Sequence, residues 1–197
     1  MNRPGLTYDS FRGAIDVDKP DRFDFSYWEP IAASLANQCR YKGSIPEGHF
    51  YSVAEHSLHV RDKVTKWPPF GRALKAEIAL AALLHDAHEA VIGDIPAPLY
   101  RVLSPSAQRE IDSIKRRIDG ALGSAFGIEL RDSPALEAVK RADAEVTADE
   151  LWFFYGHTDP GREPDRTWCP DVLERAQAYD QYLEALQKAK ARYDETR

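Results

Sequence analysis

The chain has 197 residues, of which 43% are hydrophobic and 29% charged, and its 26 Lys and Arg against 32 Asp and Glu give a formal net charge of −6. A chain of this length typically folds around one core, so we expect residues 1–197 to form a single domain. The acidic balance argues against extended nucleic-acid or membrane partners, which select for clustered Lys and Arg. A small anionic ligand held by one or two local cations is compatible with it.

Cysteine use and apolar runs indicate the cellular compartment. Only two cysteines occur, Cys39 and Cys169, which predicts reduced thiols rather than a disulfide framework. The amino terminus lacks the apolar segment of a signal peptide. The longest apolar run, residues 78–84, is far shorter than the roughly 20 residues that cross a membrane. We therefore expect a cytoplasmic protein.

The amino-terminal segment differs from the rest of the chain. Residues 1–25 are rich in Asp, Arg, Gly and Pro and show no sustained hydrophobic period, which predicts an irregular arm packed on the body. After it, Ser26 and Glu29 have the spacing of a capping box, in which two side chains satisfy free backbone amides at a helix start. We expect this helix to continue to about Cys39.

Helix signals continue through the rest of the chain. A second capping box, Ser52 and Glu55, predicts a helix that ends at the segment 67–70. The apolar segment from Arg72 to about Val91 predicts a central, buried helix. Proline at a first helical position is a start signal. It predicts further helices over 105–126, 134–154 and 170–195. The sequence thus predicts an all-α fold of five to seven helices.

Two histidines and an acid share one face in the segment 85–89. Helical spacing brings His85, His88 and Glu89 together, and Asp86 lies at the edge of that face. Burying an ionised carboxylate without a partner costs several kcal/mol. Asp86 therefore requires a cation, a metal ion or a cleft.

A second acid, Asp143, lies in another apolar segment, 138–146. Two histidines and two aspartates drawn from three helices would offer a divalent ion two nitrogen and two oxygen ligands. Such a set leaves further positions for water and substrate. The sequence therefore predicts a metal site.

The order His56, His85-Asp86 and Asp143 resembles the H…HD…D signature of the HD-domain metal-dependent phosphohydrolases. The similarity covers about residues 33–150 and implies an HD-domain helical bundle with its metal-site core at 26–155. It also implies that His56, His85, Asp86 and Asp143 bind one divalent ion. Zn²⁺, Co²⁺ and Mn²⁺ are the first candidates, with Mg²⁺ as a further one.

Longer matches point to particular branches of that superfamily. Segments 52–58, 85–98 and 139–143 resemble the 5′-deoxynucleotidases, in which HDxxE…GDxPxP recurs. Segments 37–43 and 50–56 also resemble a related phage branch that hydrolyses dATP to the nucleoside. The resemblance therefore implies a deoxynucleotide substrate.

The resemblance assigns roles to four further residues. Glu89 matches the acid that works beside the metal, and Asp94 matches an acid that handles the attacking water or the leaving oxygen. Asp94 could instead be only a turn former. Arg40 matches an arginine that grips substrate phosphate, although a cation there could also cap a helix end. Tyr41 stands where the bacterial nucleotidases tend to have Trp, in the region that selects sugar and base.

Other polar residues near the motifs are candidates for substrate contacts. His59 and His88 either support a ligand carboxylate or phosphate or are polar residues on partly exposed turns. Lys42, Arg61 and Lys63 could hold the outer phosphates of a longer substrate. The sequence therefore leaves open how many phosphates the substrate carries.

The expected function is a metal-dependent hydrolase that cleaves between the 5′-oxygen and the α-phosphorus of a dNMP or dNTP and releases the nucleoside. One alternative is an HD-type phosphodiesterase acting on cyclic nucleotides or alarmones. No histidine occurs between Glu89 and Asp143, which favours one ion over two. The other alternative is a nucleotide sensor without turnover. By analogy with the family, we expect a homo-oligomer.

Overall fold

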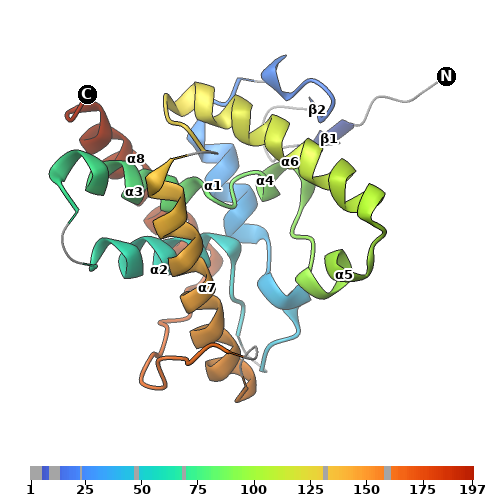
Figure 1. Cartoon of the computed structure of the whole chain (residues 1–197), viewed down its shortest axis with the longest axis vertical. Helices are drawn as coiled ribbons and strands as arrows, with labels where there is room; N and C mark the ends of the chain where they lie inside the picture. The colour runs from blue at the N-terminus through green and yellow to red at the C-terminus, as the bar shows by residue number, and fades with distance from the viewer. Residues whose placement is uncertain are drawn as a thin grey trace.

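The computed structural model describes residues 6–8, 14–22, 24–46, 49–67, 70–130, 133–157 and 161–197. The α-helices in this part of the chain (Figure 1) are α1 (Trp28–Asn37), α2 (Val53–Thr65), α3 (Arg72–Leu84), α4 (Glu89–Ile92), α5 (Ala97–Val102), α6 (Pro105–Phe126), α7 (Pro134–Tyr155) and α8 (Arg175–Asp194). The six long helices have between 10 and 22 residues. The predicted all-α bundle is confirmed, and α4 and α5 are short additions to it.

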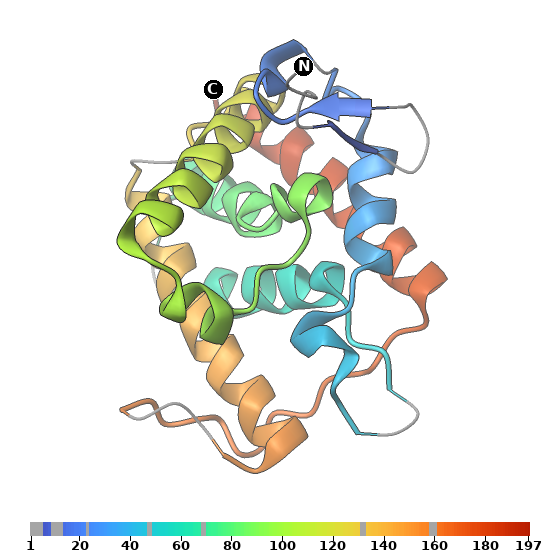
Figure 2. The ribbon, with the colours of Figure 1, turned by 90° about the vertical axis from the view of Figure 1, so that its right-hand side faces the viewer.

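Helices α2 and α3 form the centre of the bundle. In Figure 2 they lie side by side, with α6 and α7 on one flank and α1 and α8 on the other. Their inner faces supply Val60, Leu80 and Leu83, which are fully buried. Among the described residues, no helix is long and apolar enough to cross a lipid bilayer.

The amino-terminal arm is more regular than predicted. Strands β1 (Leu6–Tyr8) and β2 (Ala14–Asp16) pair antiparallel, with Thr7 opposite Ile15. A 3₁₀ turn, Pro20–Arg22, follows and contacts α6. Ile15 is buried in the main core, so the arm packs on the body as expected. The pairing escaped prediction because each strand is too short to show an alternating pattern.

The capping box predicted for Ser26 and Glu29 would start helix α1 at Tyr27, but the helix begins at Trp28. Its N-cap is Tyr27, and no side chain caps it. The amide of Ser26 instead donates to the Asp24 carboxylate at 2.9 Å, so a local turn replaces the Ser26–Glu29 box. The helix ends at Asn37 because Cys39 pairs with Ser52 in a β-bridge. This pairing fixes the segment that carries Arg40.

The capping box of α2 is confirmed. The Ser52 hydroxyl accepts from the Glu55 amide at 3.1 Å, and the Glu55 carboxylate accepts from the Ser52 amide at 2.8 Å. Both residues are fully buried. Glu55 also accepts from the Leu173 amide at 2.7 Å. The box therefore joins the start of α2 to the segment before α8.

The predicted helix from Arg72 to Val91 is interrupted. Helix α3 ends at Leu84, and turn residues 85–88 separate it from α4. Within this turn the Ala87 amide donates to the Leu84 carbonyl at 3.0 Å, and the Glu89 amide donates to the Asp86 carbonyl at 2.9 Å. These i to i−3 bonds tighten the backbone relative to an α-helix. The His85-Asp86 pair thus lies on a turn.

Two other helix limits differ from prediction. Helix α8 begins at Arg175 rather than Pro170, because the Leu173 amide is held by Glu55 and the backbone remains extended up to Glu174. Helix α5 was not expected, since it lies between the stop signal at Pro96 and the next start at Pro105. The ends of α6 and α7 agree with prediction to within one residue.

Candidate metal centre

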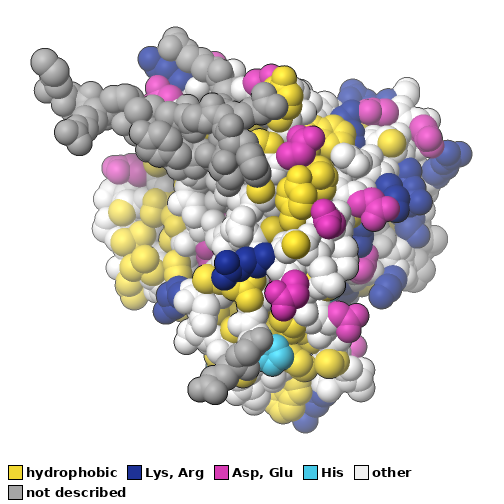
Figure 3. All heavy atoms as spheres, turned by 180° about the vertical axis from the view of Figure 1, so that it is seen from behind, with side chains coloured by type: hydrophobic (Ala, Val, Ile, Leu, Met, Phe, Trp, Pro, Cys, Tyr) yellow, Lys and Arg dark blue, Asp and Glu magenta, His cyan; other side chains and the backbone are white. Residues whose placement is uncertain are grey.

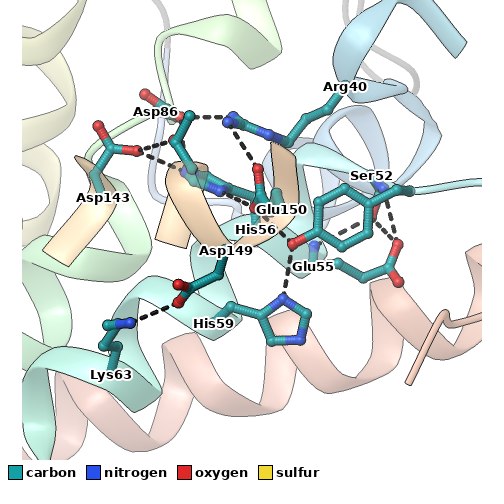
Figure 4. A network of polar contacts seen from close by, with 12 residues as sticks. Arg40, Ser52, Glu55, His56, His59, Lys63, Asp86, Asp143, Asp149 and Glu150 are labelled. Atoms are coloured by element: carbon teal, nitrogen blue, oxygen red, sulfur yellow. Dashed lines mark hydrogen bonds and ion pairs between the residues drawn. The ribbon is translucent and has the colours of Figure 1, made fainter. Parts of the chain in front are cut away.

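The four predicted metal ligands converge, although they come from three separate elements. His56 lies on α2, His85 and Asp86 on the turn after α3, and Asp143 on α7. His56 Nε2 is 3.0 Å from Asp143 Oδ1 and 3.8 Å from Asp86 Oδ2. His85 Nε2 is 3.2 Å from Asp86 Oδ2 and 4.0 Å from Asp143 Oδ1. Figure 4 shows His56, Asp86 and Asp143 directed toward one another.

The ligand atoms of His56, His85 and Asp86 lie within 4.8 Å of one another, which fits a single divalent ion, and Asp143 adjoins this group through His56 and His85. A tetrahedral ion with ligand bonds of about 2.1 Å holds its ligand atoms about 3.4 Å apart, which lies within the observed range. His85 Nε2 is buried and has no hydrogen-bond partner among the described residues. A buried polar atom without a partner is costly, and coordination would satisfy it. The residues present therefore fit a metal ion.

The histidine rings are oriented by contacts on their other nitrogens. His56 Nδ1 donates to Glu150 Oε1 at 2.6 Å, and His85 Nδ1 donates to the Ala82 carbonyl at 2.8 Å. Such contacts fix the tautomer in which Nε2 carries the free lone pair. Burial lowers the pKa of His85, but the carboxylates of Asp86 and Asp143 outweigh it and raise that pKa to about 9. The cluster therefore attracts positive charge strongly.

Glu150 belongs to the candidate site, although it was not predicted. Its buried carboxylate accepts hydrogen bonds from the hydroxyls of Tyr41 at 2.6 Å and Tyr51 at 2.7 Å, besides that from His56. It also pairs with Arg40 at 3.3 Å. Burial alone would raise the pKa of Glu150, but Arg40 and His56 hold it far below its ordinary value. Glu150 is therefore a permanent anion behind the ligands.

Arg40 joins this anion to the ligand cluster. Its guanidinium lies 3.7 Å from Asp86 Oδ2 as well as against Glu150, and its Nε is buried with no hydrogen-bond partner in the described part of the chain. Tyr41 and Lys42 follow it with positive φ angles of 54° and 58°, an uncommon conformation for residues other than glycine. This bend turns the segment back along the edge of the cluster.

A pocket of about 630 Å³ opens in front of the cluster. Several residues with predicted roles share its wall: Arg40, Tyr41, Lys42, Asp86, Asp94 and Asp143. Arg101 and Arg162 add two further cations, and α5, α7 and the segment before α5 supply apolar wall residues. The volume is ample for a nucleotide. On the described part of the face in Figure 3, basic side chains are interspersed with acidic ones rather than forming a band.

The two predicted catalytic acids lie at different depths. Asp94 lines the pocket, and burial raises its pKa. Glu89 is only 7% exposed and accepts from Gln38 Nε2 at 3.1 Å. Burial and the nearby Asp86 raise the pKa of Glu89 to about 9. Glu89 thus lies beside a metal ligand rather than in the pocket wall.

Three residues near the motifs lie away from the predicted phosphate site. His59 Nδ1 is 2.7 Å from the Tyr51 hydroxyl, and its ring packs edge-on against Trp168. Arg61 pairs with the adjacent Asp62, and Lys63 pairs with Asp149 at 2.6 Å. They do not line the pocket with Arg40.

His88 lies close to the metal-ligand cluster. A ring nitrogen of His88 is within 4.8 Å of ligand atoms of Asp86 and Glu89, and His88 Nδ1 contacts Asp119 at 3.0 Å. A second hollow of about 420 Å³ is lined by His85, Asp86, Asp119 and Asp143. Asp86 and Asp143 therefore border both spaces.

Curated relatives match this chain over different lengths. It is 37% identical over 121 residues to the uncharacterized protein YfdR of Escherichia coli K12, covering 61% of the chain and 56% of YfdR. It is 34% identical over 87 residues to a 5′-deoxynucleotidase of Vibrio cholerae, covering 41% and 44%. The chain thus matches only about half the length of these two relatives. No protein-family model matches it.

The broadest of the three matches is to a protein of Rhodobacter capsulatus. The chain is 32% identical over 158 residues to the uncharacterized protein RCAP_rcc00048, and the match covers 74% of this chain and 76% of that protein. It includes most of both sequences. The chain therefore belongs to the same family as RCAP_rcc00048.

Proposed function

We propose that this protein is a metal-dependent phosphohydrolase of the HD type that acts on deoxynucleotides and cleaves between the 5′-oxygen and the α-phosphorus. The observation that carries the proposal is the cluster of His56, His85, Asp86 and Asp143, of which Asp86 and Asp143 line a 630 Å³ pocket. The partial similarity to a 5′-deoxynucleotidase supports the same class.

The four metal ligands and Arg40 have different roles in binding phosphate. A divalent ion held by the four ligands would lower the pKa of bound water and neutralise charge on phosphoryl oxygens. Arg40 is charged at every physiological pH and can contact an anion through two N–H groups. Because Glu150 fixes both Arg40 and His56, the cation and the ligand ring keep a constant relative position. This preorganisation favours an anionic transition state.

The leaving 5′-oxygen requires a proton, and Asp94 and Glu89 are the candidates. Asp94 lines the pocket, where a substrate would contact it. Glu89 lies deeper, beside Asp86, and holds a proton at neutral pH because its pKa is raised to about 9. Either acid could supply or relay the proton, an effect worth about 10²- to 10⁴-fold in rate.

The pocket can hold substrates that carry one phosphate or several. Arg40, Lys42, Arg101 and Arg162 line it, which suits a polyphosphate chain. The similarity to a 5′-deoxynucleotidase instead supports a monophosphate. The proposal therefore includes both dNMP and dNTP substrates.

The proposal is tested by product analysis. The protein is loaded with Mn²⁺, Co²⁺ or Zn²⁺ and incubated with dNMPs, dNTPs, cyclic nucleotides and alarmones. We expect a nucleoside together with orthophosphate from a dNMP or triphosphate from a dNTP. Hydrolysis of only the cyclic nucleotides or alarmones would replace the proposal with the phosphodiesterase alternative. Tight nucleotide binding without any product would replace it with a sensor.

Two substitutions separate binding of the ion from turnover. We expect Asp86→Ala to lose both the ion and activity, because Asp86 is central to the ligand cluster. Asp94→Asn should keep the ion of the four-ligand site and lower kcat by about 10²-fold or more. Metal analysis and steady-state kinetics on the same samples check both. Full activity of Asp94→Asn would remove Asp94 from the mechanism.

A further inference from the structure

A second group of potential ligands adjoins the four-ligand site. Asp86, His88 and Glu89 each offer a ligand atom, and these atoms lie within 4.8 Å of one another. His88 and Glu89 are each only 7% exposed. The Asp86 side chain is 20% exposed. Two neighbouring carboxylates repel each other when both are ionised, and a cation between them would remove that repulsion. The group is therefore a candidate cation site.

His88 is oriented like the two histidines of the first site. Its Nδ1 contacts the Asp119 carboxylate at 3.0 Å, as His56 Nδ1 contacts Glu150 and His85 Nδ1 contacts the Ala82 carbonyl. Its Nε2 is buried and has no hydrogen-bond partner in the described ranges. His85 Nε2 likewise has no hydrogen-bond partner there, although it lies 3.2 Å from Asp86 Oδ2. A carboxylate behind a histidine is the usual support of a metal ligand.

Asp86 and Glu89 each keep an oxygen for this second position. The ion pairs of Asp86 with Arg40, His56 and His85 all use Oδ2, so Oδ1 can serve a neighbouring ion. Gln38 donates to Glu89 Oε2, which leaves Oε1 available. One nitrogen and two oxygens form a ligand set that suits Mn²⁺, Co²⁺ or Zn²⁺.

We propose that Asp86, His88 and Glu89 bind a second divalent cation, with Asp86 bridging it to the ion of the four-ligand site. The inference rests on the proposed metal centre, because the two sites share Asp86. It goes beyond the single ion expected from the sequence: His88 precedes the histidine-free interval between Glu89 and Asp143. Two ions held by these residues would place two positive charges beside one phosphoryl group.

This arrangement also gives Glu89 and Asp94 different roles. As a ligand, Glu89 is ionised and cannot give a proton to the leaving oxygen. Asp94 lines the pocket and is then the acid that transfers the proton. Asp86 and Asp119, the acid that contacts His88, both line the second hollow.

The experiment counts ions directly and does not depend on turnover. The full chain is stripped with a chelator, reloaded with excess Mn²⁺, desalted and analysed by mass spectrometry for metal per protein. Electron paramagnetic resonance then tests whether the ions are magnetically coupled, as bridged Mn²⁺ ions are. We expect two coupled ions per chain. One ion per chain overturns the inference and leaves the proposed centre intact, whereas none overturns both.

Variants identify the ligands of the second ion. His88→Gln should bind one uncoupled ion, and Asp119→Asn should bind the second ion about 10- to 100-fold more weakly. His49→Gln, which changes an exposed histidine, is the matched control and should bind two. Circular dichroism checks that each variant is folded. If folded His88→Gln still binds two coupled ions, the assignment is wrong.

Discussion

Glu150 organises the site through contacts rather than by binding an ion. It holds the ring of His56, the guanidinium of Arg40 and the hydroxyls of two tyrosines. Its position in the sequence contained a usable signal: it follows Asp143 by two turns of α7 and so lies on the same helix face. Nothing in the sequence alone indicated which partners would meet it, because all of them lie about a hundred residues away.

We expect Glu150→Gln to weaken both the fold and the ion site. The substitution removes a buried anion and leaves Arg40 without its fully buried partner, a change worth about 3 kcal/mol or more. The affinity for the ion should fall by about 10- to 100-fold because His56 loses its charged support. Chemical denaturation and a metal titration measure the two effects.

Glu145→Gln is the matched control for this substitution. Glu145 is on the same helix and pairs with the largely exposed Arg141 and, at 3.9 Å, with Lys63; because these are partly solvated pairs, its loss should change stability by no more than about 0.5 kcal/mol. Equal effects of the two variants would contradict the role assigned to Glu150.

His59 should make stability depend on pH. Burial lowers its pKa from 6.5 to about 4, so the unfolded chain binds a proton more readily between these values. Its contribution is therefore fully present above about pH 6.5 and is lost as the pH falls toward 4, by up to roughly 3 kcal/mol. The free energy of unfolding, measured for the wild type and His59→Gln across this range, checks the sign. A difference between them that does not change with pH would contradict it.

At the scale of elements, helix starts were predicted correctly where residues close in sequence determine them. The Ser52–Glu55 box and the Pro starts of α6 and α7 depend on residues three or four apart. The break of the long apolar segment at residues 85–88 could not be predicted in this way. No Gly or Pro marks it, and the turn is held in place by the contacts of His85, Asp86 and His88 with α2, α6 and α7.

The capping box of α2 should contribute directly to the position of His56, one turn further along. We expect Ser52→Ala to destabilise the protein by about 1 to 2 kcal/mol, because it leaves the Glu55 amide and part of the Glu55 carboxylate without a buried partner. Ser104→Ala removes the cap of α6 at an exposed site and should cost less. Thermal unfolding of both variants decides this, and an equal or smaller loss for Ser52→Ala would argue against the account.

At the scale of the whole molecule, the candidate centre depends on how the central helices pack. Its ligands come from α2, the turn after α3, and α7, and these helices contact one another around the core. The unfolded chain has no preformed cage, so an ion bound by all three elements stabilises only the folded state. Metal binding and global stability should therefore be linked.

The most direct test of the central claim is thermal unfolding of the metal-free protein as Zn²⁺ or Mn²⁺ is added. At 100 times the dissociation constant, binding should stabilise the wild type by about 2.7 kcal/mol, which raises Tm by roughly 5 to 10 °C. His56→Ala and Asp143→Ala, which remove ligands on α2 and α7, should show little or no rise. An unchanged Tm for the wild type, or an equal rise in these variants, would contradict a metal centre built from the three elements.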